Sequence, residues 1–242
     1  MARLFVSDVH LDSAHPEATA QFLDFLGGEA ADAEALYILG DLFEAWIGDD
    51  DTDPDKARVG AGLKALSARG VACFLLHGNR DFLLGGEFCA RAGCRLLPDP
   101  VVAQLDGERV LLTHGDALCT DDHSYQELRS VVRDELWQQR FLALPRARRE
   151  LLANEARAGS RAHTARTVPT IMDVNAQAVQ AAFRAARVRR MIHGHTHRPA
   201  VHDLMLDGAP AQRIVLGAWY EQGSYLRCEA GKYQLRELPR PS

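Results

Sequence analysis

The chain has 242 residues, of which 47% are hydrophobic, 25% charged and 7% aromatic. This is ordinary globular composition, and it excludes a fibrous or largely disordered protein. The net charge of −5 excludes a polybasic nucleic-acid binder. No apolar run approaches the ~20 residues of a membrane-spanning helix, and Asp8 interrupts the N-terminal apolar run too early for a secretory signal. The five cysteines are an odd number without a CxxC pair, so we expect a reducing, cytoplasmic environment.

Short apolar runs recur along the chain, and each one is cut off by glycine or polar residues. This pattern is typical of buried strands. The predicted strands are residues 4–6, 36–39, 71–76, 110–112 and 191–192. Helical spacing of apolar residues predicts helices over residues 16–26 and 54–68. The alternation of strand and helix favours a layered α/β core.

Two regions depart from this alternation. Residues 213–216, 224–229 and 232–237 are separated by glycine-bearing turns and predict a β-meander. Residues 121–166 are helical: one helix begins at Asp121 and Asp122 and runs to Leu136, and Pro145 opens a second helical stretch. We therefore predict a core of residues 1–120 and 167–242, interrupted by an inserted helical segment of residues 121–166.

The inserted segment has its own charge. Seven arginines lie between Arg140 and Arg166, against only Glu150 and Glu155. A solvated helical hairpin that uses arginine as a surface residue is one explanation. The other is a cap over the active site whose arginines face an anionic ligand or anionic lipid headgroups.

The polar residues that end the strands suit metal binding. Ligands of open α/β sheets bind beyond the carboxyl ends of the strands, so these side chains should converge. The donors are Asp8, His10, Asp41, Asn79, His114, His195 and His197. Mixed nitrogen and oxygen donors suit Mn²⁺, Fe²⁺, Co²⁺ or Zn²⁺ better than Ca²⁺ or Mg²⁺.

Seven donors are too many for one tetrahedral site, but two sites with a bridging carboxylate use them all. The first site would contain Asp8, His10, Asp41 and His197. The second would contain Asp41, Asn79, His114 and His195. Two metals ~3.5–4 Å apart can hold a phosphoryl oxygen and activate a water molecule.

The ordered set D-x-H, GD, GN, H and GHxH resembles the calcineurin-like metallophosphoesterase superfamily. This resemblance implies a β-sandwich flanked by helices, with a dimetal centre. The blocks SDVHLD, ILGDLFEAWIGDDD, HGNRDFLLG, LTHGDALCTDD, IMDVN and IHGHTHRPAVH further resemble the UDP-2,3-diacylglucosamine pyrophosphatase family. The inserted segment then corresponds to a lid that holds two acyl chains.

The family resemblance implies a substrate, a cofactor and a location. The substrate would be the glycolipid nucleotide UDP-2,3-diacylglucosamine of lipid A biosynthesis. A hydroxide activated by two Mn²⁺ would attack its α-phosphorus and yield UMP and 2,3-diacylglucosamine 1-phosphate. We expect a monomer that binds no nucleic acid and lies peripherally on the cytoplasmic face of the inner membrane.

The resemblance also implies roles for individual residues of this chain. Asn79, Arg80 and His195 would be catalytic. The substrate contacts would be Asn79, Arg80, Asp122, Tyr125, Arg157, Ser160, Thr164, Thr167 and His195. Position 167 is often Lys in the family and is Thr here, so one phosphate or headgroup contact is missing unless the adjacent Arg166 supplies it. The acyl cleft could be lined by Trp46, Phe82, Phe141 and Leu142, which could equally be packing residues.

One departure from the superfamily is informative. Many members carry His, a proton donor to the leaving oxygen, where this chain has Arg80. A phosphate monoester leaving group has a second pKa of about 6, so it departs near pH 7 without protonation. Arg80 can instead pair with the phosphate and stabilise developing charge. This favours pyrophosphate cleavage over monoester hydrolysis.

Two other functions remain open. One is a phosphodiesterase or phosphatase for nucleotides or phosphoproteins, which has no need of an arginine-rich lid with an apolar lining. The other is a metal-free scaffold that uses the fold to bind partners. A scaffold of that kind would have lost several ligands, whereas all seven are present.

Overall fold

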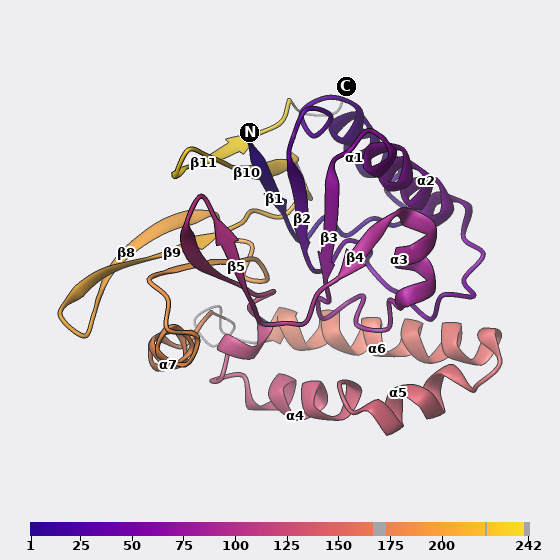
Figure 1. The fold of residues 1–242 in the computed structure, drawn as a ribbon. Helices are drawn as coiled ribbons and strands as arrows, with labels where there is room; N and C mark the ends of the chain where they lie inside the picture. Colours follow the sequence, from indigo (N-terminus) through magenta and orange to yellow (C-terminus); the bar gives the residue numbers. More distant parts are fainter. Residues whose placement is uncertain (167–172, 221, 240–242) are drawn as a thin grey trace.

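The computed structural model describes residues 1–166, 173–220 and 222–239. Two mixed β-sheets lie face to face, and helices cover their outer surfaces (Figure 1). The expected α/β architecture, a β-sandwich flanked by helices, is confirmed.

The first sheet has six strands in the order β11-β10-β1-β2-β3-β4. The strands β1 to β4 are parallel to one another, and β10 and β11 add an antiparallel hairpin. Their bounds are β1 Arg3–Val6, β2 Ala35–Leu39, β3 Ala72–Leu76, β4 Cys94–Leu96, β10 Ser224–Glu229 and β11 Lys232–Glu237.

The second sheet has five strands in the order β5-β6-β7-β9-β8. Here β6, β7 and β9 are parallel, while β5 and β8 pair antiparallel at the two edges. Their bounds are β5 Val101–Leu105, β6 Glu108–Leu112, β7 Arg190–His193, β8 Ala200–Leu206 and β9 Ala209–Val215.

The predicted β-meander at the C-terminal end is therefore wrong in one respect. The strand that contains Arg213 is β9, and it pairs with β7 and β8 of the second sheet. Only β10 and β11 form the predicted hairpin, in the first sheet. The chain crosses between the sheets after β9, which local turn patterns do not reveal, because sheet membership depends on packing between distant strands.

The apolar core has three layers. Side chains from both sheets, such as Phe5, Leu39 and Ile192, fill the space between them. The outer face of the first sheet packs against α1 Pro16–Gly27, α2 Pro54–Ala68 and α3 Gly86–Ala92. The outer face of the second packs against α7 Ala176–Ala186 through residues such as Phe183. Because both faces of the parallel strands are covered, their carboxyl ends are held rigidly.

The inserted segment emerges at one end of this sandwich (Figure 1). A short 3-10 helix, η1 Asp116–Leu118, leads into α4 His123–Val132, α5 Glu135–Leu142 and α6 Arg146–Arg166. The single helix predicted to run to Leu136 is in fact two, because the Asp134 side chain accepts a hydrogen bond from the backbone N–H of Trp137 and caps a new helix. We call α4, α5 and α6 the lid.

The lid is fastened to the core by a buried arginine. The Arg149 guanidinium donates to the backbone carbonyls of Leu144 and Ile47 and pairs with Asp50. Since Ile47 and Asp50 belong to the loop after β2, this contact fixes the start of α6 against the core. No described helix combines the length and apolar character needed to cross a membrane.

Candidate metal centre

The predicted donors are carried on an unusual backbone. A left-handed φ between 53° and 68° occurs at five of the seven, namely Asp8, His10, Asp41, His195 and His197. A residue with a Cβ pays a steric penalty in this region, so such conformations persist only where the surrounding structure enforces them. The strand ends turn abruptly at these residues, which directs the side chains to one place.

Two glycines allow the strand ends to approach closely. A Cβ on Gly78 would overlap the Asp41 carboxylate, and a Cβ on Gly194 would overlap Asp8 and Ser7. Glycine is therefore required beside the donors, because the backbone of one strand end runs against the carboxylate of another.

The first group of donors is formed by Asp8, His10 and His197. The Nε2 atoms of His10 and His197 are 3.4 Å apart. Asp8 Oδ1 lies 3.3 Å from His197 Nε2 and 3.9 Å from His10 Nε2. The three ligand atoms lie within 4.8 Å of one another, as one metal ion requires. The structure thus brings together residues 8, 10 and 197.

The second group is formed by Asp41, Asn79, His114 and His195. Asn79 Oδ1 is 2.9 Å from His114 Nε2 and 2.8 Å from His195 Nδ1. Asp41 Oδ2 is 3.7 Å from His114 Nε2 and 3.8 Å from His10 Nε2. This oxygen therefore lies between His114 of the second group and His10 of the first. Asp41 also lies with Asp8 and His114 in a set of ligand atoms within 4.8 Å of one another, so both carboxylates are near both groups.

The proton arrangement shows that these groups fit a cation. His10 donates through Nδ1 to Glu44, and His114 donates through Nδ1 to the carbonyl of Leu39. When these rings are neutral, their Nε2 atoms carry no proton and are hydrogen-bond acceptors that face carboxylate oxygens. Asp8 Oδ1 is buried and accepts no hydrogen bond in the described part of the chain. Acceptors facing acceptors in a buried site require positive charge between them.

The pKa values of His114 and Asp41 also indicate that positive charge is favoured at this site. Burial alone lowers the pKa of His114, but Asp41 and Asp8 outweigh burial and raise it to about 9. Burial raises the pKa of Asp41 to about 6. Burial also favours the acid form of Asp8, yet the adjacent His197 imidazole brings its pKa below the usual range. Burial lowers the pKa of the donor His195 to about 4, so protons are taken up at His114 and Asp41 while His195 stays neutral. Divalent cations would compete with protons at His114 and Asp41.

Arg80 and Glu44 lie beside the donors. The Arg80 backbone N–H donates to Asp41 Oδ1 at 2.7 Å, and its Nη1 lies 3.8 Å from Glu44 Oε1. Its Nε is buried and has no hydrogen-bond partner in the described residues. A guanidinium with a spare buried donor beside two metal positions is suited to an anionic group of the substrate.

The lid is tied directly to this centre. Asp116 is buried and accepts hydrogen bonds from Tyr125 Oη at 2.6 Å and Arg129 Nε at 2.8 Å. The Tyr125 ring lies 5.8 Å from the His195 ring. Arg133 donates to the carbonyl of Gly78, next to the donor Asn79. Helix α4 is thereby positioned over the second group of donors.

The other predicted substrate contacts lie along the lid. Asp122 caps α4 by accepting from the Tyr125 N–H. Arg157 of α6 lies 3.6 Å from Asp12 of the core. Ser160 and Thr164 belong to α6, but the structure describes only the backbone of this helix after Gly159. Thr167 lies outside the described residues.

The four candidates for an acyl cleft separate into three kinds. Trp46 is buried among Phe43 and Phe88, which makes it a core packing residue. Phe82 of the core lies 6.2 Å from Trp137 of the lid, which stacks on Phe141 at 5.1 Å. Leu142 ends α5 and is exposed.

Several supporting residues lie within the sequence motifs but received no role from them. Glu44 orients His10, Asp116 anchors the lid, and Asp81 accepts backbone hydrogen bonds from Asp41, Leu42 and Gly78. Asp81 and Asp116 each lie two residues after a donor, which is a signal that could have identified them. Nothing in the sequence distinguishes Glu44 from its acidic neighbours.

Removal of the Glu44 carboxylate tests whether it orients a ligand. Glu44→Ala should lower the affinity for Mn²⁺ about 10–100-fold, the usual effect of losing the partner of a ligating histidine. Calorimetric titration of Mn²⁺ measures this. Glu17→Ala is the matched control, because Glu17 pairs with the exposed His15 at 3.2 Å. Equal affinities of the two variants would show that Glu44 has no such role.

Comparison with known proteins agrees with this geometry. The model of the calcineurin-like phosphoesterase family matches residues 1–199. A protein of Aeromonas hydrophila is 52% identical over 98% of both chains, and one of Escherichia coli is 50% identical over 99% of this chain and 100% of its own. Both are named UDP-2,3-diacylglucosamine hydrolase.

Among solved structures, an archaeal phosphodiesterase shares the fold. It has a TM-score of 0.51 at 12% sequence identity, and the match covers 98% of this chain and 100% of the other. The family match spans all seven donors, and the relatives extend over the lid and the C-terminal strands as well. The chain belongs to the calcineurin-like phosphoesterase family.

Proposed function

We propose that this protein hydrolyses the pyrophosphate bond of UDP-2,3-diacylglucosamine to UMP and 2,3-diacylglucosamine 1-phosphate, a step of lipid A synthesis. The observation that carries the proposal is the cluster of two carboxylates, four imidazoles and one amide at the strand ends. The names of relatives that are about half identical over nearly the whole chain supply the substrate. Mn²⁺ is the proposed metal, since the donors are mixed nitrogen and oxygen ligands.

The proposed reaction attaches a water oxygen to the α-phosphorus. The bond from this phosphorus to the bridging oxygen breaks, and its electron pair leaves with 2,3-diacylglucosamine 1-phosphate. The seven donors would hold a pair of divalent cations, which would supply activation of the attacking water and neutralisation of the phosphoryl charge. The leaving phosphate monoester has a second pKa of about 6 and needs no proton donor. This agrees with Arg80, whose guanidinium stays protonated near pH 7 and pairs with anions.

Arg80 and Arg157 are the proposed cations for the diphosphate. The Arg80 backbone N–H donates to Asp41, and its guanidinium lies 3.8 Å from Glu44, the hydrogen-bond partner of the donor His10. Asn79 and His195 act as ligands that also contact the phosphate. Tyr125 lies against His195 and is thereby positioned to contact the sugar. We assign Asp122, Ser160, Thr164 and Thr167 to the remaining substrate contacts.

The acyl chains are proposed to enter between the lid and the core. Phe82, Trp137 and Phe141 form a continuous aromatic cluster at this junction. Their rings provide apolar surface beside the proposed diphosphate site, which a substrate with only polar groups has no use for.

The lid also supports peripheral membrane contact. Its large exposed apolar residues are Leu128, Val131, Leu136, Leu142 and Leu151. Exposed arginines lie between them, including Arg140, Arg146 and Arg148. Apolar side chains flanked by cations are suited to a surface of anionic lipid. We propose that a monomer binds the cytoplasmic face of the inner membrane through this lid surface.

Substrate comparison tests the proposed activity. With Mn²⁺ and detergent, the protein should release UMP from UDP-2,3-diacylglucosamine, and kcat/KM for UDP-glucosamine should be lower by a factor on the order of 10² or more, because each buried CH₂ contributes about 0.8 kcal/mol. Quantification of UMP by chromatography measures both. Equal values would indicate a general nucleotide phosphodiesterase, and no turnover of either compound by the metal-loaded protein would reject the proposal.

Vesicle binding tests the membrane proposal. Replacement of Leu128 and Leu136 by Ser should weaken binding to phosphatidylglycerol vesicles by a factor on the order of 10² or more, since each buried leucine contributes about 1.5–3 kcal/mol and about 1.4 kcal/mol is tenfold. Cosedimentation measures the bound fraction. The control replaces Val201 and Met205 by Ser, because these residues are similarly exposed on β8, outside the lid. The proposal fails if both double variants bind as the unchanged protein does, or lose binding equally.

A further inference from the structure

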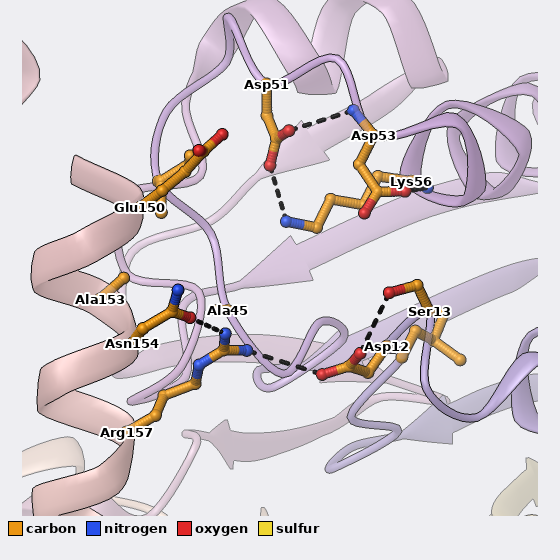
Figure 2. A pocket seen from close by; sticks show the side chains of 12 residues that line it. Asp12, Ser13, Ala45, Asp51, Asp53, Lys56, Glu150, Ala153, Asn154 and Arg157 are labelled. Carbon is orange, nitrogen blue, oxygen red and sulfur yellow. Dashed lines mark hydrogen bonds and ion pairs between the residues drawn. The ribbon is translucent and has the colours of Figure 1, made fainter. Parts of the chain in front are cut away.

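A cavity of about 230 Å³ lies between helix α6 and two loops of the core (Figure 2). One wall is the face of α6 that carries Ala153, Asn154 and Arg157. The other wall contains Asp12 and Ser13 from the loop after β1, and residues of the loop between β2 and α2. None of the roles proposed above uses this space except that of Arg157.

The cavity adjoins the metal centre. Leu11, which lines it, directly follows the donor His10, and Ala45 directly follows Glu44, the hydrogen-bond partner of His10. Arg157 lies at one end of the cavity, where it faces Asp12 across the space at 3.6 Å (Figure 2). A substrate phosphate at the metal centre would therefore have this cavity next to it.

The lining excludes an acyl chain and a second phosphate. Four carboxylates, those of Asp12, Asp51, Asp53 and Glu150, face two cations, Lys56 and Arg157. Burying an acyl chain here would strip water from charged groups without replacing it. The excess of carboxylates would repel a phosphate.

Most of these charges are already satisfied within the protein. Lys56 Nζ pairs with Asp51 at 2.7 Å, Asp53 caps α2, and Glu150 pairs with Arg146 at 3.2 Å. The remaining polar groups contact one another and Arg157: Ser13 Oγ donates to Asp12 at 3.4 Å, Asn154 Oδ1 accepts from Arg157, and Asp12 lies 3.6 Å from Arg157 (Figure 2). A ligand would exchange with these exposed contacts and meet the hydroxyl, carboxylate and amide groups of Ser13, Asp12 and Asn154. Such groups recognise an uncharged ligand with several hydrogen-bonding positions.

The volume indicates one part of a substrate. Pockets that enclose whole drug-sized ligands measure about 300–1,000 Å³, and this cavity is smaller. The substrate of the proposed function has acyl chains, a sugar that carries them, a diphosphate and a nucleoside. Only the nucleoside is uncharged, polar and joined directly to the α-phosphate.

We infer that this cavity is the nucleoside subsite and that it holds the uracil and ribose of the substrate and of the product UMP. The inference rests on the proposed function. Asp12 is suited to accept from the ribose hydroxyls, and Asn154 can both donate to and accept from a pyrimidine ring. The nucleoside then lies between α6 and the core on one side of the phosphates, apart from the aromatic cluster proposed for the acyl chains.

Filling the cavity tests the inference. Ala153→Leu adds bulk from α6, and Ser13→Leu adds it from the opposite wall. Ala156→Leu is the matched control, because Ala156 is an exposed residue of the same helix outside the lining. Calorimetry with the Mn²⁺-loaded protein measures the Kd of UMP and of ribose 5-phosphate, which lacks the base.

The expected result is that the unchanged protein and Ala156→Leu bind UMP more tightly than ribose 5-phosphate. Ala153→Leu and Ser13→Leu should each raise the Kd of UMP about tenfold and remove most of this preference. The inference is overturned if both filled variants bind UMP like the control, or if they weaken binding of 2,3-diacylglucosamine 1-phosphate instead. The calorimetric result does not depend on turnover, so failure of the proposed activity is seen separately, as absence of UMP release by the unchanged protein.

Discussion

The structure depends on a set of proton acceptors that face one another in a buried space. Asp8, Asp41, His10 and His114 direct carboxylate oxygens and imidazole Nε2 atoms to one place, while hydrogen bonds to Glu44 and Leu39 occupy the opposite nitrogens of the two rings. This arrangement is stable only with positive charge at its centre. The left-handed backbone at the donors is conformationally unfavourable, so the rest of the fold must stabilise this arrangement of the donors.

Two further parts of the molecule serve this centre. The helices that cover both sheets hold the strand ends rigid, so that donors far apart in sequence stay within bonding distance of common points. The lid is attached at three places. Asp116, two residues after the donor His114, accepts hydrogen bonds from Tyr125 and Arg129 of α4. Arg133 donates to the carbonyl of Gly78, and Arg149 donates to the carbonyl of Ile47 in the loop after β2. A metal centre, an aromatic junction and a polar cavity therefore lie between lid and core, where they match the diphosphate, the acyl chains and the nucleoside of the proposed substrate.

Much of this could be predicted from sequence because each donor directly follows a short apolar run, and the carboxyl ends of parallel strands share one edge. The strands were predictable for that reason where they precede the donors Asp8, Asp41, Asn79, His114 and His195. The position of β9 in the second sheet was not predictable, because turn patterns do not specify which strand pairs with which. The break at Asp134 is local, because the Asp134 side chain caps α5. The role of Glu44 and the cavity beneath α6 arise from tertiary contacts, which leave no periodic trace in the chain.

Metal content tests the central claim most directly. The purified protein, equilibrated with Mn²⁺ and freed of excess ion, should retain two Mn²⁺ per chain, and their electron paramagnetic resonance should show the spin coupling expected of ions ~3.5–4 Å apart. Asp41→Ala, which removes the oxygen between the two groups of donors, should abolish that coupling. Retention of no Mn²⁺, or of two uncoupled ions in the unchanged protein, would contradict the account.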